Sequence, residues 1–314
     1  MDYILISSPL QGFTDFRFRN TFHAVMGGID TYYAPYIRLD GKKEMKKQTQ
    51  RDLQPVNNQT PKLIPQVLTN NASDFIWVAQ QMQQLGYSEL NWNLGCPYPM
   101  VSKRGMGAGL LNNPAQIDRV LQQVFAESDT KISVKMRLGL ESKFEIFEVL
   151  PVLNKYPLQN ITIHPRIGKQ LYKGEVDLAI FEKCIGLTPH TICYNGDINS
   201  VDTFREHANR FPGIKHWLIG RGLIADPFLP QMIKNNTLQY PENKLEQFRK
   251  FHDILFSEYE QALSGSGHLL HKMSALWEYF ARLFPNTPKA FKMIKKANNI
   301  KAYNEAVGAI MANK

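Results

Sequence analysis

One cysteine of this chain stands where a side chain leaves the core. Residues 90–109 read LNWNLGCPYPMVSKRGMGAG, an apolar run that ends in Asn-Leu-Gly-Cys-Pro and opens into a loop rich in glycine and positive charge. A cysteine within a strand is usually a small hydrophobic residue, but Cys96 lies between Gly95 and Pro97 at the end of the run and faces whatever the loop faces. The pattern indicates a reactive thiol at a functional site.

Further polar side chains occupy the ends of apolar runs. They are Gln66, Asn93, Lys135, Arg137, His164, Arg166, Asn195 and Arg221. Lys135 has apolar neighbours in SVKMRLG, and a buried ammonium is costly unless it meets an anion or an electron-rich ligand, which favours a functional lysine. His164 in ITIHPR fits a satisfied core histidine as well as a functional one.

The elements that must position these side chains are eight short β-branched or aromatic runs. They begin at residues 3, 30, 62, 89, 131, 160, 190 and 216. Helix-like segments with Ser, Asn or Pro start signals lie between several of them, as at 73–86, 114–128 and 200–211. Eight strands alternating with helices over about 235 residues match a (β/α)8 TIM barrel of the α/β class. An open doubly wound sheet would carry GxGxxG after its first strand, which SPLQGFTDFRFR lacks.

The pattern changes to helices alone after the polar, proline-containing segment PFLPQMIKNNTLQYPENK. Helix-like segments follow from residues 245, 268, 288 and 300. We therefore predict two domains, a catalytic TIM barrel at residues 1–240 and a C-terminal all-helical domain at residues 241–314.

Two glycine-bearing turns follow the last two strands, YNGDINS from residue 194 and IGRGLIADP from residue 219. In this barrel the reactive groups lie at the carboxyl ends of the strands, and the loops after strands seven and eight commonly bind a phosphate through backbone N–H groups. The two turns together predict a phosphorylated cofactor or substrate, with Arg221 as its charge partner.

The charge of the chain is positive and unevenly distributed. Lys and Arg number 37 against 28 Asp and Glu, a net charge of +9 that favours polyanionic partners. Residues 38–51 hold six basic and two acidic side chains, and residues 241–314 hold eleven and seven.

Three widely spaced cysteines form neither a disulfide framework nor a CxxC metal pair, so we expect a reducing compartment and no metal. Cys184, in a helix-like segment, and Cys193, within a strand, are expected in the core. The N-terminal segment lacks the features of a signal peptide, and no apolar run approaches the roughly 18 residues of a membrane span. We expect a cytoplasmic monomer without membrane contact.

Taken together, the motifs resemble the tRNA-dihydrouridine synthases, flavin enzymes that reduce uridine in tRNA. SPLQGFTDFRFR is similar to the family's opening A-P-M-x-G-x-T-D-x-x-F-R, and LNWNLGCPYPMV to its central D-x-N-x-G-C-P-x-x-x-V. VKMRLG, ITIHPR, YNGDI and IGRG follow in the family's order. The Asn-x-Gly-Cys-Pro element is the most specific, and the resemblance covers the barrel and, more loosely, the helical tail.

The resemblance implies FMN over the barrel mouth and NADPH as its reductant. It places cofactor contacts on Pro9, Leu10, Gln11, Gln66, Lys135, His164, Asn195, Gly196, Asp197, Gly220 and Arg221. The first three of these would lie against the isoalloxazine, the next three would contact the ring and ribityl chain, and the rest would surround the chain and phosphate.

The resemblance further implies that the reduced flavin delivers hydride to C6 of a uracil, so that C5 must receive a proton. Cys96 is then the proton donor, since a thiol with a pKa of about 8.5 is mostly protonated at neutral pH. Asn93 would hydrogen-bond the uracil edge, and Arg137 its carbonyl or the nearby phosphate, where charge develops.

A uridine inside folded tRNA has to be extruded into the barrel mouth, which a basic surface must offset. Contacts with the substrate or the tRNA are therefore expected from Arg38, Lys42, Lys43, Lys46, Lys47, Lys103, Arg104, Arg166, Lys272 and the lysines of 292–296. Three positions depart from the family pattern, Asn91 for Asp, Pro165 for Gly and Ser8 for Ala.

Three other functions remain open at this point. An FMN barrel acting on a free pyrimidine has the same residues but no use for a basic helical tail. A noncatalytic tRNA-binding protein on the same scaffold has no use for Cys96. An aldolase with Lys135 as Schiff base lacks a nearby pair of acids.

Overall fold

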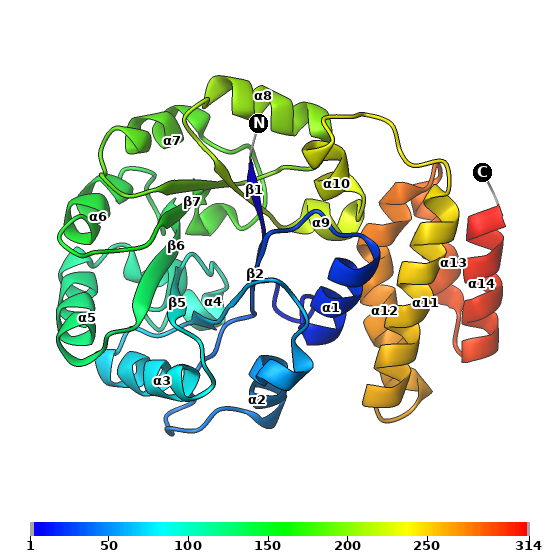
Figure 1. Cartoon of the computed structure of the whole chain (residues 1–314), viewed down its shortest axis with the longest axis horizontal. Coiled ribbons are helices and arrows are strands. Elements are labelled where there is room, and N and C mark those ends of the chain that lie inside the picture. The colour runs from blue at the N-terminus through cyan, green and yellow to red at the C-terminus, as the bar shows by residue number, and fades with distance from the viewer. Residues whose placement is uncertain (1–2, 313–314) are drawn as a thin grey trace.

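The computed structural model describes residues 3–312. A barrel of parallel strands is surrounded by helices, and four further helices stand together at one side (Figure 1). The strands are β1 (Ile4–Ser7), β2 (Thr31–Tyr33), β3 (Leu63–Ile64), β4 (Gln66–Val67), β5 (Glu89–Leu94), β6 (Lys131–Gly139), β7 (Ile161–Ile167), β8 (Ile192–Asn195) and β9 (His216–Ile219). Their order in the sheet is β3-β2-β1-β9-β8-β7-β6-β5-β4.

The two end strands of this order, β3 and β4, are one barrel strand interrupted at Pro65. β3 pairs with β2 and β4 with β5, so the barrel closes through this position. Proline has no N–H for the strand ladder, although its carbonyl still accepts the backbone N–H of Asn91 at 2.9 Å. The eight strands predicted from the sequence are confirmed, with the third in two pieces.

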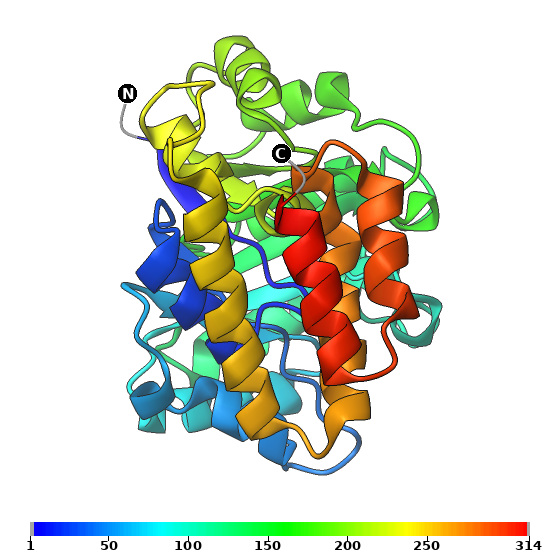
Figure 2. The ribbon, with the colours of Figure 1, turned by 90° about the vertical axis from the view of Figure 1, so that its right-hand side faces the viewer.

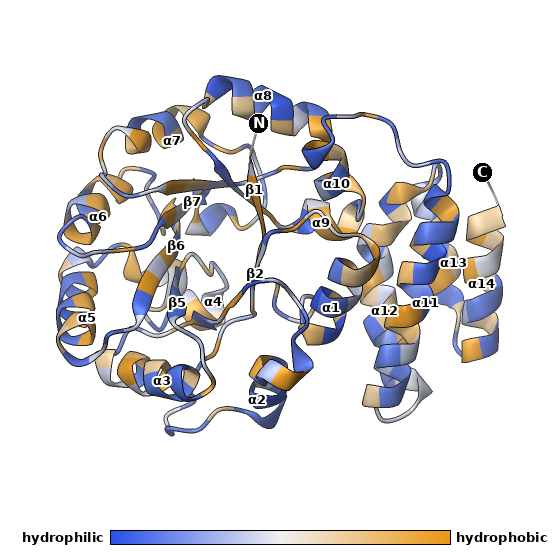
Figure 3. Ribbon diagram, in the orientation of Figure 1, coloured by the Kyte–Doolittle hydropathy of each residue, from blue (hydrophilic) through white to orange (hydrophobic). Residues whose placement is uncertain are grey.

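Side chains alternate across each strand and so divide between two cores. In β5, Leu90, Trp92 and Leu94 pack outward in the large cluster between sheet and helices, whereas Asn91 and Asn93 belong to the opposite set. The apolar cluster inside the barrel is small, and it consists of Ile6, Tyr33, Ile64, Cys193 and Leu218. The mixed colours along the strands and helices of Figure 3 reflect this division. The same alternation directs polar residues near the strand ends into the barrel mouth.

The barrel helices predicted at 73–86, 114–128 and 200–211 are present at 72–84, 114–127 and 201–210. Asn71, Asn113 and Ser200 each cap a helix by accepting a backbone N–H with the side chain. The α-helices are α1 (Phe16–Val25), α2 (Lys47–Leu53), α3 (Ala72–Gln84), α4 (Pro99–Ser102), α5 (Pro114–Glu127), α6 (Ile146–Leu153), α7 (Leu178–Ile185), α8 (Val201–Arg210), α9 (Arg221–Ala225) and α10 (Leu229–Lys234). Short 3-10 turns lie at η1 (Pro55–Asn57), η2 (Gly107–Leu110) and η3 (Gly168–Gln170).

Four helices that lie side by side form the C-terminal region, which faces the viewer in Figure 2. They are α11 (Lys244–Ala262), α12 (Ser266–Phe280), α13 (Thr287–Lys296) and α14 (Ile300–Ala312), with the 3-10 turn η4 (Ala281–Leu283) after α12. The region rests on the barrel through aromatic rings, since Phe251 packs edge-on against both Phe18 and Phe22 of α1. The helical tail is confirmed, and the domain boundary at residue 241 stays a prediction.

The described residues hold neither a helix long and apolar enough to cross a membrane nor a cluster of three or more His, Cys, Asp or Glu side chains that could bind a metal.

Candidate active site

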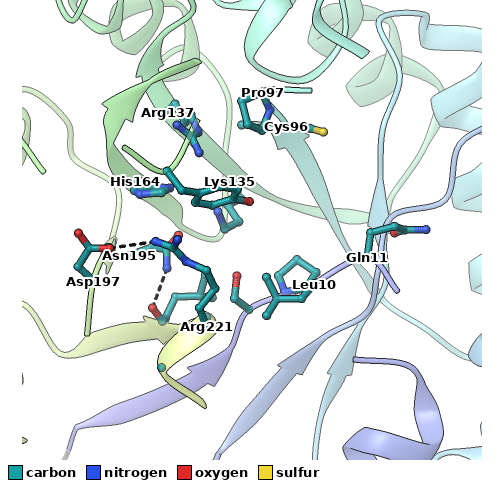
Figure 4. Close-up of a pocket in the computed structure, with 18 of the residues that line it drawn as sticks. Leu10, Gln11, Cys96, Pro97, Lys135, Arg137, His164, Asn195, Asp197 and Arg221 are labelled. Atoms are coloured by element: carbon teal, nitrogen blue, oxygen red, sulfur yellow. Dashed lines mark hydrogen bonds and ion pairs between the residues drawn. The ribbon is translucent and has the colours of Figure 1, made fainter. Parts of the chain in front are cut away.

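A cavity of about 250 Å³ opens at the carboxyl ends of the barrel strands (Figure 4). Thirteen of the residues that the sequence marks as site residues line it: Pro9, Leu10, Gln11, Asn93, Cys96, Lys135, Arg137, His164, Asn195, Gly196, Asp197, Gly220 and Arg221. They come from six strand ends or the loops after them, so the barrel brings together side chains up to about two hundred residues apart in sequence. Gln11 lies at the edge of this group, and its side chain points away from Lys135.

Lys135 lies at the centre of the cavity lining. In the strand pairing, Lys135 of β6 lies opposite Asn93 of β5. Arg137, two residues further along β6, lies opposite His164 of β7. Burial and the neighbouring Arg137 lower the pKa of Lys135 to about 7. No carboxylate of the described residues lies within ion-pair distance of its Nζ atom. The cavity therefore contains a half-buried amine without a counter-ion, which an electron-rich or anionic ligand would complete.

His164 is held neutral and in one tautomer. Burial, together with Arg137, Lys135, Arg166 and Arg221, lowers the pKa of His164 well below its usual value. Nη1 of Arg166 lies 3.2 Å from Nε2 of His164. Because a guanidinium can only donate, Nε2 must accept and the ring proton must reside on Nδ1. The site thus has a neutral imidazole with an Nδ1–H donor.

Asp197 ties two arginines together beside the glycine turn. Its carboxylate accepts hydrogen bonds from Arg166 and, at 3.2 Å, from Nη2 of Arg221. Asp197 adopts a left-handed backbone conformation with φ of 45°, directly after Gly196. Arg166 also donates to the carbonyl of Gly174 at 2.7 Å. These bonds fix Arg221 at the cavity wall while leaving part of its guanidinium available.

A chain of amides inside the barrel holds the residue that precedes the cysteine loop. The Gln66 amide donates to Asn91 Oδ1 at 2.7 Å, and its carbonyl accepts from Asn93 Nδ2 at 2.7 Å. Asn91 in turn donates to Ser133 Oγ at 3.1 Å. Asn91 stands where the family pattern has Asp, and it donates an amide N–H that an aspartate lacks. Ser133 accepts this hydrogen bond, so the structure accommodates the asparagine.

Cys96 is fixed from both sides. Its backbone N–H donates to Asn93 Oδ1 at 2.9 Å, and its carbonyl accepts from the N–H of Ala108 at 3.0 Å. Gly107 packs so closely on it that an added Cβ would lie 2.7 Å from the Cys96 carbonyl oxygen. Burial raises the pKa of the Cys96 thiol. The cysteine therefore carries its proton at neutral pH and faces the cavity.

Sequence reasoning missed the aromatic side chains of the cavity wall. They are Phe13, Tyr36, Tyr98, Tyr172 and Tyr279. The Tyr172 ring faces the guanidinium carbons of Arg221 at 4.3 Å and Arg137 at 5.3 Å. Tyr172 follows η3 in a loop with no apolar periodicity, so nothing in the sequence alone marked it.

Tyr279 differs from the other aromatic residues of its part of α12. Trp277 and Phe280 are fully buried, whereas Tyr279 lines the cavity and packs edge-on against Phe13 at 5.5 Å. Helical periodicity could have distinguished Tyr279 in the sequence, because it lies on a different face of the helix from Trp277 and Phe280. The helical region therefore completes one side of the cavity.

Gln66, Arg38, Lys103, Arg104, Arg166 and Lys272 do not line the cavity, and neither do the predicted lysines of 42–47 and 292–296. Gln66 and Arg166 lie one step behind it, as the contacts above show, and the Arg166 side chain is only 2% exposed. Lys103 and Arg104 are exposed in the cysteine loop, and Arg38 pairs with Asp40 at 3.0 Å.

Lys272 lies in the junction between the barrel and the helical region rather than on an open surface. Its Nζ donates to the carbonyl of Gly12 at 2.7 Å, lies 3.7 Å from the Asp15 carboxylate and faces the ring of Tyr259 at 4.4 Å. Tyr259 also donates to Asp15 at 2.8 Å. The tRNA contact expected at Lys272 stays a prediction, and the ammonium that would make it already bonds the loop that follows Gln11.

The family model described as dihydrouridine synthase (Dus) matches residues 5–312 of the chain. Similar curated proteins include the tRNA-dihydrouridine(16) synthase of Ralstonia nicotianae, 25% identical over 76% of this chain and 75% of that protein. A probable tRNA-dihydrouridine synthase 2 of Bacillus subtilis is 26% identical over 82% and 79%. A probable tRNA-dihydrouridine synthase of Staphylococcus aureus is 29% identical over 58% and 55%.

Solved structures share the fold at low sequence identity. A 2-naphthoyl-CoA reductase in complex with 2-naphthoyl-CoA has a TM-score of 0.53 and 12% identity, over 74% of this chain and 50% of that chain. A morphinone reductase mutant in complex with tetrahydroNAD has a TM-score of 0.51 and 10% identity, over 79% and 90%. These likenesses show a common barrel architecture.

Proposed function

The chain belongs to the dihydrouridine synthase family, and we propose that it reduces the C5–C6 double bond of a uridine in tRNA to 5,6-dihydrouridine. FMN is the proposed cofactor and NADPH its reductant. The observation that carries the proposal is the presence, in one cavity, of a protonated thiol at Cys96 and a half-buried amine without a counter-ion at Lys135. This combination suits proton donation beside an electron-rich ring.

The residues present fit a flavin. The amine of Lys135 lacks a counter-ion, and the Nδ1–H of His164 is a second donor, so both suit the electron-rich edge of an isoalloxazine. Arg221 would hold the phosphate, with Asn195 and Gly196 around the ribityl chain. When bound, FMN supplies the hydride that uracil C6 receives.

Cys96 donates the proton that completes the reaction. The S–H bond breaks, its electron pair stays on sulfur, and the proton forms the new bond at C5. A raised thiol pKa keeps this proton in place at neutral pH before reaction. The hydrogen bonds of Asn93 and Ala108 to the Cys96 backbone hold the thiol in position, so that little reorganisation is needed.

The uracil is oriented by groups that surround the thiol. Asn93 spends one amide hydrogen on Gln66, so its second remains for a base edge. Arg137 donates to the carbonyl of Ile167 at 2.8 Å and has further N–H groups for a uracil oxygen, where negative charge develops. Tyr172 and Tyr279 offer ring faces on which an extruded base can stack.

The tRNA backbone is proposed to lie on two exposed basic segments. One holds Lys42, Lys43 and Lys46 between β2 and α2, Lys47 at the start of α2, and Lys103 and Arg104 in the cysteine loop. The other is α13, whose buried side carries Ala290 and Ile294 and whose open side carries Lys292, Lys295 and Lys296. Such lysines suit phosphates and require no base sequence. A tRNA substrate agrees with the cytoplasmic location expected from the sequence.

The direct test is incubation of the purified protein with FMN, NADPH and tRNA transcribed without modifications, followed by nucleoside mass spectrometry. The expected product is uridine that has gained two hydrogens, at one position after fragment mapping. Free uridine and UMP in parallel reactions are expected to stay unreduced.

Reduction of the free nucleoside at a rate equal to that of tRNA would favour a pyrimidine oxidoreductase. Binding of tRNA without any reduction, although the flavin is reduced by NADPH, would favour the noncatalytic alternative. Replacing NADPH by NADH in the same assay identifies the preferred reductant.

A further inference from the structure

Tyr36 lies against the reactive thiol, and no motif assigned it a role. Its ring packs on the small cluster formed by Leu68, Cys96 and Val101, which is separate from the main core. Tyr36 and Cys96 both line the cavity. The phenol is therefore in a position to meet the thiol at the place where the proposed proton transfer occurs.

Both partners are held by backbone hydrogen bonds. The segment with Tyr36 continues the line of β2, where the N–H of Ile37 donates to the carbonyl of Gln66 at 2.7 Å and the N–H of Leu68 to the carbonyl of Ile37 at 2.9 Å. Cys96 is fixed by the contacts with Asn93 and Ala108 described above. A phenol and a thiol on two anchored segments form a preorganised pair.

The electrostatics of the pair determine which group would donate a hydrogen bond. Burial raises the pKa of Tyr36 to about 12, and the neighbouring Cys96 adds to that rise. Tyr36 in turn lowers the pKa of the Cys96 thiol, against the larger effect of burial. Tyr36 therefore stays protonated, and its hydroxyl can donate a hydrogen bond to sulfur, which stabilises a thiolate.

The other groups that face the thiol come from two elements. Lys135 and Arg137 of β6 lower the pKa of the thiol, and so does the backbone N–H of Tyr98 in the cysteine's own loop. The pKa of Tyr36 is lowered by Arg38 and raised by Tyr98. Among these groups, Tyr36 is the neutral hydroxyl-bearing side chain that packs against the cluster containing Cys96.

We propose that Tyr36 is a positioning residue for the reaction, whose hydroxyl donates a hydrogen bond to Cys96 Sγ, orients the S–H group and stabilises the thiolate that remains after the proton has moved to C5. Its part in turnover rests on the proposed function. The O–H bond of Tyr36 stays intact in this step, and the thiolate regains a proton from solvent water.

The test measures the thiol itself and needs neither flavin nor tRNA. The rate of alkylation of Cys96 by iodoacetamide is followed from pH 6 to 11 by mass spectrometry of the peptide that carries it, in the unsubstituted protein and in Tyr36→Phe. Phenylalanine keeps every ring carbon of the packing. The expected result is a midpoint raised by about one pH unit and alkylation about tenfold slower at pH 8.

Tyr98→Phe is the matched control, because it also removes a phenol beside the cysteine loop but leaves the backbone N–H that contacts sulfur. Its midpoint is expected to equal that of the unsubstituted protein. A Tyr36→Phe midpoint that does not move, or a shift of equal size in Tyr98→Phe, would overturn the proposal. A merely structural role of Tyr36 would alter thermal unfolding without moving the midpoint.

A second measurement covers the case in which Tyr36→Phe does not fold. In the Tyr98→Phe background all tyrosines are replaced biosynthetically by 3-fluorotyrosine, a stronger hydrogen-bond donor, and the midpoint of Cys96 is expected to fall. An unchanged midpoint contradicts the hydrogen bond. If the midpoints behave as expected but tRNA is not reduced, the bond stands and the proposed function fails; if tRNA is reduced but the midpoints coincide, Tyr36 fails and the function stands.

Discussion

At the scale of single residues, the protonation states of two buried groups decide what the cavity can do. Burial raises the pKa of the Cys96 thiol and lowers that of Lys135 to about 7. Both shifts favour the uncharged form, which is the usual effect of removing a charge from water. The thiol gains a firmly held proton from this, and the amine gains a strong preference for an electron-rich partner.

Cys96→Ala should keep the flavin bound and reducible by NADPH while slowing uridine reduction about 100-fold or more, because only the proton donor is removed. Flavin retention is measured by absorbance after gel filtration, and turnover by dihydrouridine content of tRNA. Cys184→Ala, at a buried cysteine of α7 that does not line the cavity, is the control and should turn over normally. Loss of flavin from Cys96→Ala would assign the thiol to cofactor binding instead.

Lys135→Met should weaken flavin binding and yet stabilise the cofactor-free protein. The pKa of about 7 in the folded state lies below the ordinary value of about 10.4, so between these pH values the unfolded chain binds more protons and stability rises with pH. At pH 8 the amine therefore costs about 2 to 4 kcal/mol, which methionine removes.

Urea unfolding of cofactor-free Lys135→Met and of the unsubstituted protein checks this sign. The gain in unfolding free energy should be largest at and below about pH 7, fall as pH rises, and vanish only well above a pH of about 10.4, where Lys135 is neutral in both states. Lys131→Met, at an exposed lysine of the same strand, is the control and should show no such pH-dependent gain. A gain that is constant with pH would point to apolar packing rather than to the buried amine.

At the scale of elements, the loop after β5 depends on one close approach. Gly107 has φ of 58°, and an added Cβ would lie 2.7 Å from the Cys96 carbonyl oxygen and 2.9 Å from its Cβ. Gly105 has a similar φ of 65°, but its nearest neighbour would be a side-chain nitrogen of Asn70 at 3.4 Å. The two positions separate backbone strain from the clash with the cysteine.

Gly105→Ala should lower the unfolding free energy by about 1 to 2 kcal/mol, the cost of a left-handed alanine. Gly107→Ala should cost more than this, and it alone should change the alkylation rate of Cys96, since the cysteine has to shift. Denaturant unfolding and alkylation kinetics measure the two effects. Equal results for the two variants would mean that the loop adapts without moving Cys96.

Local sequence pattern is sufficient to predict the elements but not the contacts between them. The strand runs and the start signals at Pro114 and Ser200 are local, and the structure has them where the pattern places them, whereas the helix predicted from Ser73 is capped by Asn71. Residues at strand ends reach the cavity because a parallel barrel brings all carboxyl ends together. Tyr172 and Tyr279 could not be predicted in this way, because one lies in an irregular loop and the other on a helix from another region of the chain.

The same distinction explains the basic side chains. The sequence predicts that Arg166 and Lys272 are available to contact a substrate. In the structure Arg166 bonds Asp197, and Lys272 bonds the carbonyl of Gly12. A charge count along the chain cannot separate an internal ion pair from an exposed lysine. Only packing distinguishes them, since it decides which cations remain in contact with solvent.

At the scale of the whole molecule, the helical region both covers the cavity and extends the basic surface. Tyr279 lines the cavity, while Lys272 and Tyr259 bind the loop with Gly12 and Asp15 that follows the predicted flavin contacts. Deleting the region would therefore disturb the cavity as well as any tRNA contact. Charge substitution on its exposed surface separates the two effects.

Lys292→Gln with Lys296→Gln should weaken tRNA binding and flatten its dependence on salt, because each lost phosphate contact lowers the slope of log K against log salt by about 0.7 to 0.9. Lys131→Gln with Lys215→Gln is the matched control, since both lysines are exposed at the amino ends of β6 and β9, opposite the cavity. Filter binding of tRNA across a series of salt concentrations measures each slope.

Lys272→Met completes the comparison and tests the junction by the same measurement. Because its ammonium bonds Gly12 rather than facing solvent, the slope should stay that of the unsubstituted protein while flavin affinity falls, since the loop beside Gln11 loses its anchor. A reduced slope in Lys272→Met would return this lysine to the tRNA-binding surface. An unchanged slope in the Lys292 and Lys296 variant would remove α13 from that surface and leave the segment between β2 and α2 as its main part.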